Sequence, residues 1–270
     1  MDTYSQLYNK CYYINLDRAV ERKNYMEKTL LEQGIQAERI PAVDGNTIHE
    51  IIHNPYNFPG IFWNKYALGL VRTCKNILIN AIENDHETIM ILEDDVVFEE
   101  NFNQCLKDYC EQLPDDWGVV QLSVGSFKRE NAINYINRNI VQIEGTCGTF
   151  GMLINKRFYH LIINAIEQLP LPLDDIFICI QRQFKKSFAF YPGLLNPLDG
   201  IQSSITGQEC NYSQTFDYIH PPPVKNVIEE GRKNAFLSDS ESMSDSDISG
   251  NNSECKPKRK RCRKKKKKHK

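Results

Sequence analysis

The chain has 270 residues, 41% of them hydrophobic, which is enough to bury a large α/β core. Its formal net charge of −2 hides an asymmetry, because 12 of the 33 basic residues lie between Lys256 and Lys270. Residues 1–250 carry 21 basic against 34 acidic residues, so this part of the chain is unsuited to binding a phosphate backbone. No apolar run approaches the ~18 residues of a membrane span. Nine cysteines without a Cys-x-x-Cys pair, and a start without an apolar signal segment, predict a cytoplasmic protein with reduced thiols.

The beginning of the chain predicts a βαβ unit. Residues 11–16 form an aromatic and apolar run of strand length, and residues 19–33 repeat apolar residues at helical spacing. Asp17 is a possible cap of this helix, and Gly34 ends it. A second strand is expected over residues 37–43, closing in a turn at Asp44-Gly45.

Strand and helix patterns continue to alternate through the middle of the chain. Helices are expected at residues 68–82, 102–113 and 156–168, and strands at 88–92, 117–124, 140–143 and 149–154. We expect the strand at 140–143 to lie at a sheet edge and Pro170 to end the last helix. This alternation predicts an α/β fold with a mixed, mainly parallel sheet and helices on both faces. Ligands of such sheets bind at the carboxyl ends of the strands.

The composition divides the chain into three parts. A catalytic domain is predicted over residues 5–225, an acidic, serine-rich disordered linker over 226–250, and a polybasic disordered tail over 251–270. The tail can attract an anionic partner, either nucleic acid or a membrane surface, and leaves a nuclear location open.

Three adjacent acids follow the predicted strand 88–92 directly: Glu93, Asp94 and Asp95. Because like charges repel, a divalent cation with oxygen ligands is one way to neutralise them, and a solvated acidic loop is the alternative. Asp95 is the first choice for metal contact, followed by Glu93 and then Asp94. The expected ion is Mn2+ or Mg2+.

Six short segments in a fixed order carry a resemblance to a known family. They are Tyr13-Ile14-Asn15-Leu16-Asp17-Arg18 with Arg22, Pro41-Ala42-Val43-Asp44-Gly45, Leu92-Glu93-Asp94-Asp95-Val96, residues 148–156, Pro172-Leu173-Asp174-Asp175-Ile176-Phe177, and Tyr191-Pro192 with Gln202-Ser203-Ser204-Ile205. Together they resemble glycosyltransferase family 25, which includes lipopolysaccharide and collagen galactosyltransferases. The chain differs in lacking a Ser-His pair near residues 68–75 and in having Ser204 where the family has Asp.

The resemblance implies a GT-A-like (Rossmann-like) fold and a metal-dependent transfer of a hexose from a nucleotide sugar, most simply a UDP-hexose, to an acceptor hydroxyl with inversion. The acceptor stays open between a glycan, a lipid-linked sugar and a protein. The nucleotide-binding residues it implies are Asn15, Leu16, Asp17, Arg22, Ala42, Val43, Asp44 and Gly45. Asp174 or Asp175 is the expected base that accepts the proton of the acceptor; capping of a helix by an Asp is the alternative.

Two other functions stay open. The segment His49-Glu50-Ile51-Ile52-His53 matches the His-Glu-x-x-His pattern of zinc metalloproteases, which requires a long helix that this stretch has little room for. The chain can also be an inactive transferase fold that acts as an adaptor through its basic tail.

Overall fold

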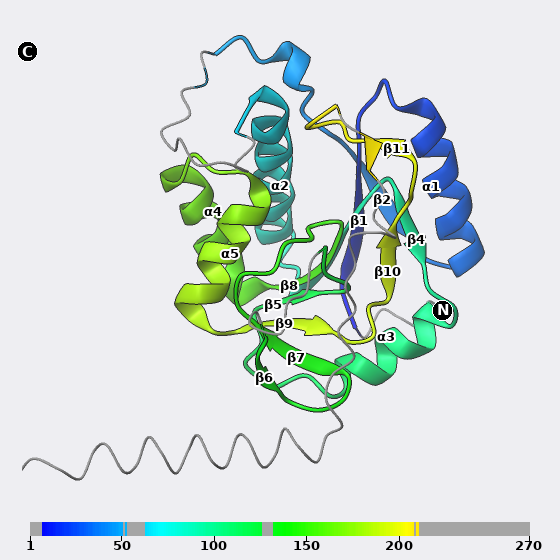
Figure 1. Cartoon of the computed structure of the whole chain (residues 1–270), viewed down its shortest axis with the longest axis vertical. Helices are drawn as coiled ribbons and strands as arrows, with labels where there is room; N and C mark the ends of the chain where they lie inside the picture. The colour runs from blue at the N-terminus through cyan, green and yellow to red at the C-terminus, as the bar shows by residue number, and fades with distance from the viewer. Residues whose placement is uncertain (1–6, 51, 53–62, 126–131, 208, 211–270) are drawn as a thin grey trace, which may run out of the picture. The chain divides into compact units, whose positions relative to one another are not determined.

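The computed structural model describes residues 7–50, 52, 63–125, 132–207 and 209–210 (Figure 1). The linker and tail predicted for residues 226–270 lie outside these ranges, and so does His53.

An eight-stranded sheet forms the centre of the described structure. Its strands, in spatial order, are β2 (Ala37–Pro41), β1 (Lys10–Asn15), β3 (Thr88–Glu93), β8 (Gly151–Asn155), β5 (Val119–Gln121), β9 (Ser187–Phe190), β7 (Ile140–Ile143) and β6 (Ala132–Tyr135). Strands β8 and β7 run opposite to the other six. The predicted mixed, mainly parallel sheet is therefore confirmed.

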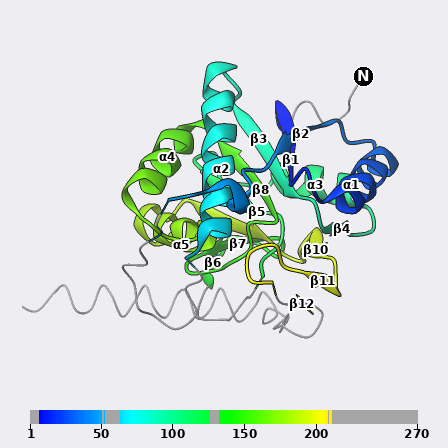
Figure 2. The same cartoon turned by 90° about the horizontal axis from the view of Figure 1, so that it is seen from above.

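Helices cover both faces of this sheet, as predicted (Figure 2). One face packs against α1 (Val20–Gln33) and α3 (Phe102–Cys110), and the other against α2 (Lys65–Glu83), α4 (Tyr159–Gln168) and α5 (Leu173–Phe184). Two 3-10 turns, η1 (Gly45–Thr47) and η3 (Lys156–Phe158), precede α2 and α4 along the chain.

Strand β1 shows why the sheet is covered on both faces. Its residues alternate between two cores: Cys11 and Tyr13 pack with α1 and α3, whereas Tyr12 and Ile14 pack with α2 and α5. A strand that is buried on both faces has a continuous run of apolar residues in its sequence. That pattern is what predicted strand β1.

Helix α1 ends as predicted but begins differently. Gly34 takes the left-handed conformation, with φ of 67°, that suits a glycine after a helix. At the other end the cap position is Ala19, which makes no side-chain capping bond. The prediction of Asp17 as the cap was wrong, because its carboxylate pairs with Arg39 at 2.6 Å instead.

Helix α2 begins at Lys65, three residues before the predicted start. The side chain of Asn64 accepts hydrogen bonds from the backbone N–H groups of Tyr66 and Ala67, both at 2.9 Å. Such a cap satisfies N–H groups that have no partner within the helix.

The predicted edge position of strand 140–143 was wrong. This strand is β7, which pairs with β9 on one side and with β6 on the other. Within the described ranges, no helix has the length and apolarity needed to cross a bilayer.

Two small antiparallel pairs bring late residues to the acids. Strand β4 (Val96–Phe98) pairs with β10 (Leu195–Pro197), and β11 (Ile201–Gln202) pairs with β12 (Glu209–Cys210). The backbone N–H of Leu198 also donates to the carbonyl of Asp95 at 2.7 Å. Residues 198–207 therefore lie close to the carboxyl end of β3.

Candidate active site

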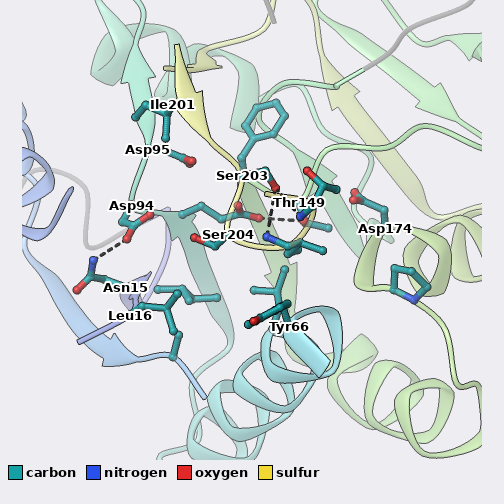
Figure 3. A pocket seen from close by; sticks show the side chains of 18 of the residues that line it. Asn15, Leu16, Tyr66, Asp94, Asp95, Thr149, Asp174, Ile201, Ser203 and Ser204 are labelled. Atoms are coloured by element: carbon teal, nitrogen blue, oxygen red, sulfur yellow. Dashed lines mark hydrogen bonds between the residues drawn. The ribbon is translucent and has the colours of Figure 1, made fainter. Parts of the chain in front are cut away.

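A pocket of about 480 Å³ opens at the carboxyl ends of β1 and β3 (Figure 3). This volume is within the range of small-molecule sites. Residues from eight parts of the chain line it: Ile14, Asn15, Leu16, Arg22, Ala42, Val43, Gly45, Tyr66, Leu70, Glu93, Asp94, Asp95, Gly125, residues 147–150, Pro172, Asp174, Asp175, Ile201 and residues 203–206.

The predicted acids share this pocket but point in different directions. Glu93 is the last residue of β3, and Asp94 and Asp95 form the turn to β4. Asp94 is 5% exposed and accepts a hydrogen bond of 2.5 Å from the side-chain nitrogen of Asn15. The carboxyl ends of adjacent parallel strands therefore hold this acid toward β1 (Figure 3).

Arg22, on the first turn of α1, neutralises part of the acid charge. Its Nη1 lies 3.1 Å from Oδ1 of Asp94 and 3.1 Å from Oδ2 of Asp95. Its Nη2 donates to the hydroxyl of Ser204 at 2.5 Å. Sequence reasoning placed Arg22 in the site but did not foresee the contact with Ser204.

Glu93 contacts the loop that carries Thr149. Thr149 donates its hydroxyl proton to Oε1 of Glu93 at 3.0 Å. Burial, followed by the negative charges of Asp95 and Asp174, raises the pKa of Glu93 to about 8. Burial likewise raises the pKa of Asp94 to about 6, against the opposing effects of Arg22 and Asn15. Among the described residues of this site, the acids outnumber the one positively charged side chain, Arg22.

Asp174 and Asp175 lie in the first turn of α5, as predicted, and both line the pocket. The cap of α5 is Pro172, which makes no side-chain capping bond. Oδ1 of Asp174 instead accepts the backbone N–H of Gly148 at 2.8 Å. Asp174 therefore holds the loop that carries Thr149, whereas the carboxylate of Asp175 is not used in this way. Burial raises the pKa of both acids.

The same loop is anchored a second time by α5. Oε1 of Gln181, which is 1% exposed, accepts the backbone N–H groups of Gly145 and Thr146 at 2.7 and 2.9 Å. Its Nε2 donates to the Thr146 carbonyl at 3.0 Å. Helix α5 thus fixes both the loop and the two acids as one unit.

The predicted nucleotide-binding residues divide into two groups. Those that line the pocket are Asn15, Leu16, Arg22, Ala42, Val43 and Gly45. Asp17 and Asp44 do not line it: Asp17 pairs with Arg39, and Asp44 pairs with Arg18 and caps η1 by accepting the N–H of Asn46.

Residues 203–206, here called the cover segment, were not predicted as part of the pocket wall. Figure 3 shows Ser203 and Ser204 between Asp94 and Asp95 on one side and Asp174 on the other. Arg22 holds Ser204, and the side-chain nitrogen of Asn64 donates to the carbonyl of Ile205 at 3.1 Å. Tyr66 and Thr149 were also missed, because neither stands in a chemical motif of its own.

The donor set of this pocket suits a hard divalent cation. Carboxylate oxygens are the preferred ligands of Mg2+ and Mn2+, and Mg2+ is commonly held by one or two carboxylates together with substrate phosphates. In the described part of the chain, no three His, Cys, Asp or Glu side chains converge into a complete metal site. Glu93 and Asp95 would therefore supply only part of the coordination, and phosphate oxygens or water would supply the rest.

The zinc-protease interpretation is not supported by the local structure. His49 and Glu50 follow η1 in non-helical backbone, and Glu50 accepts a hydrogen bond from Arg72 at 2.6 Å. The motif needs a helix to bring its histidines to one face. His53 lies outside the described residues.

The fold and pocket are those of an α/β protein with a pocket of ligand size at the carboxyl ends of its strands. The family model described as "Glycosyltransferase family 25 (LPS biosynthesis protein)" matches residues 8–69 and 77–177, and the chain belongs to this family. The interval between the matched ranges, residues 70–76, overlaps the stretch of residues 68–75 where the Ser-His pair is missing.

Curated relatives agree with this assignment. Procollagen galactosyltransferase 1 of Danio rerio is 25% identical over 187 residues, covering 62% of this chain and 30% of its own length. Procollagen galactosyltransferase 2 of Homo sapiens is 25% identical over 186 residues, covering 62% and 29%. A glycosyltransferase 25 family member of Drosophila melanogaster is 30% identical over 106 residues, covering 36% and 17%. The chain spans about a third or less of the length of these relatives.

Solved structures are more distant. A197 from STIV has a TM-score of 0.35 and 12% identity, over 67% of this chain and 80% of that protein. A glycosyltransferase involved in glycosylation of the major capsid of PBCV-1 has a TM-score of 0.34 and 10% identity, over 58% and 65%.

Proposed function

We propose that the chain is an active hexosyltransferase that uses a nucleotide sugar, most simply a UDP-hexose, with Mn2+ or Mg2+. The observation that carries this proposal is a pocket that combines apolar and acidic side chains at the carboxyl ends of β1 and β3. Ile14, Leu16 and Val43 are among its apolar residues, at β1 and the turn after β2. A nucleobase suits these apolar side chains, and a cation-bound diphosphate suits the acids.

Different residues of the pocket would bind different parts of the donor. Glu93 and Asp95 would hold a divalent cation, which would offset the charge of the departing diphosphate. Arg22 is placed to contact the same diphosphate, because its side chain is 20% exposed and lines the pocket beside Asp95. The nucleoside would lie against Leu16, Ala42 and Val43.

Asp175 is the preferred base of the two acids on α5. Both acids line the pocket, but only Asp174 accepts a hydrogen bond from the backbone N–H of Gly148. The acceptor hydroxyl would transfer its proton to Asp175 as its oxygen attacks the anomeric carbon. The bond from that carbon to the diphosphate breaks, so the sugar is transferred with inversion and a nucleoside diphosphate leaves.

The test is a thermal-shift screen of the full chain against nucleotide sugars, with and without Mn2+, repeated on Asp95→Asn. We expect one nucleotide sugar to raise the melting temperature only when Mn2+ is present, and Asp95→Asn to abolish that effect. Asp115→Asn, an exposed acid outside the pocket, is the matched control and should respond like the parent.

Hydrolysis or transfer assays with glycan, lipid-linked and protein acceptors would then identify the acceptor. A parent protein that no nucleotide sugar stabilises, in the presence or absence of Mn2+, would contradict the proposal and favour the inactive adaptor.

A further inference from the structure

Arg22 connects three parts of the site at once. One guanidinium nitrogen lies 3.1 Å from a carboxylate oxygen of Asp94 and 3.1 Å from one of Asp95, and the other donates to Ser204 at 2.5 Å. Since only 20% of this side chain is exposed, the guanidinium is held between its partners rather than solvated. The arrangement places a fixed positive charge where a divalent cation would also bind.

Charge balance decides which species the acid pair accepts. Asp94 and Asp95 together carry two negative charges when ionised, and Arg22 offsets one of them. A divalent cation that arrives at Asp95 alone meets the guanidinium a few ångströms away, and like charges repel strongly at such distances outside bulk water. A diphosphate that arrives with the cation adds negative charge, which balances the positive charges of the cation and of Arg22.

We propose that Arg22 is a positioning residue that makes cation binding at Asp95 depend on the diphosphate of the donor. The inference rests on the proposed function, because it takes the ligand to be a nucleotide with a diphosphate. In the donor-free protein, Arg22 satisfies the acids and keeps the affinity for a free cation low. When the donor binds, the guanidinium interacts with the diphosphate. Cation and nucleotide therefore bind cooperatively.

The cover segment keeps the guanidinium in this position. Ser204 accepts a hydrogen bond from Arg22, and the carbonyl of the next residue, Ile205, accepts one from the side chain of Asn64. Removing the Ser204 hydroxyl frees one end of the guanidinium without removing its charge. Ser204→Ala should therefore weaken the effect of Arg22 on cation binding but not eliminate it.

The experiment measures Mn2+ binding to the full chain by isothermal titration calorimetry, with and without UDP. We expect Arg22→Gln to increase the affinity for Mn2+ without UDP by about tenfold. The same variant should shrink the factor by which UDP enhances Mn2+ binding. Arg22→Lys retains the charge and should keep the affinity of the parent. Arg72→Gln, which removes an exposed arginine paired with Glu50, is the control and should change nothing.

An unchanged Mn2+ affinity in Arg22→Gln would overturn the inference, and so would an equal increase in Arg22→Lys, because charge would then not be the cause. These results require a parent that binds UDP with Mn2+, so they leave the proposed function intact. A parent that binds neither Mn2+ nor UDP would instead overturn the proposed function, and the inference with it.

Discussion

Asn15 at the end of β1 donates a 2.5 Å hydrogen bond to Asp94 in the turn after β3 (Figure 3). The same amide nitrogen donates to the carbonyl of Ala19 at 3.1 Å, and its oxygen accepts from Nε of Arg39 at 2.9 Å. Asn15 is 1% exposed, so both ends of its side chain are used inside the protein. It ties the start of α1, strand β1 and an acid of the pocket into one arrangement.

We expect Asn15→Ala to lower the free energy of unfolding by about 1–3 kcal/mol, because it removes the hydrogen bonds that the buried Asn15 side chain makes with Asp94 and Arg39. Chemical denaturation followed by circular dichroism measures this change. Asn84→Ala, which removes an exposed asparagine that donates to the Asn80 carbonyl, should cost less than about 0.5 kcal/mol. Equal losses in the two variants would show that the network of Asn15 adds nothing to stability.

Much of the fold could be predicted from sequence because the strands are continuous apolar runs and the helices keep their spacing. Strand β3, for example, is buried from Thr88 to Leu92 and is followed at once by its acids. The position of β7 could not be predicted, because the neighbour that covers its outer edge, β6, comes from a short and weakly patterned segment. Element order along the chain does not determine order in a sheet.

The candidate site was predictable where motif and strand end coincide, as at Glu93 to Asp95, and unpredictable where contacts link distant segments. Ser204 meets Arg22 across 182 positions of the chain, and no local pattern encodes such a pair. Asp17 and Asp44 were chosen for their place at strand ends, yet nearby arginines hold both carboxylates outside the pocket lining. Position along a strand therefore indicates a neighbourhood, but side-chain partners decide which residue faces the ligand.

Gly69 allows α2 to approach the turn after β2. A Cβ at this position would lie well inside contact distance of the Val43 carbonyl oxygen, which is backbone and cannot rotate away. We expect Gly69→Ala to lower the free energy of unfolding by about 1–3 kcal/mol. Because Val43 and Gly45 line the pocket, the same variant should weaken nucleotide binding, as measured by calorimetry.

The control for Gly69 is Asn76→Ala on the exposed side of the same helix. Alanine has a higher helix propensity than asparagine, so this change should be neutral or slightly stabilising. A Gly69→Ala protein as stable as the parent, with unchanged nucleotide affinity, would mean that the helix and turn move apart at little cost.

Cys147 offers a chemical probe of the pocket. Burial, with smaller contributions from the charges of Asp174 and Asp175, raises the pKa of its thiol to about 11. The reactive thiolate is therefore scarce at neutral pH, and alkylation of Cys147 should accelerate about tenfold for each pH unit between 7 and 10. Peptide mass spectrometry after timed exposure to iodoacetamide measures the rate at each cysteine.

A nucleotide that fills the pocket should slow the alkylation of Cys147. Cys105 on α3 is also partly exposed but does not line the pocket, so its rate should be the same with and without nucleotide. Protection of both cysteines would indicate a general tightening of the protein, and protection of neither would place the nucleotide elsewhere.

Single substitutions of Asp174 and Asp175 on α5 should have different effects on turnover and on stability. Asp175→Asn should lower the turnover number by about 10²–10⁴-fold, because an amide cannot accept the proton of the acceptor, and should leave stability and nucleotide affinity nearly unchanged. Asp174→Ala should lower the free energy of unfolding by about 1–3 kcal/mol, because the N–H of Gly148 loses its acceptor.

Asp174→Asn is the informative third variant, since its remaining oxygen can still accept from Gly148. If Asp174 only positions the loop, Asp174→Asn should keep most of the stability and most of the turnover that Asp174→Ala loses. Steady-state kinetics and denaturation of the three proteins distinguish the cases. A collapse of turnover in Asp174→Asn, combined with near-normal turnover in Asp175→Asn, would reverse the assignment and make Asp174 the base, positioned by its hydrogen bond from the backbone N–H of Gly148.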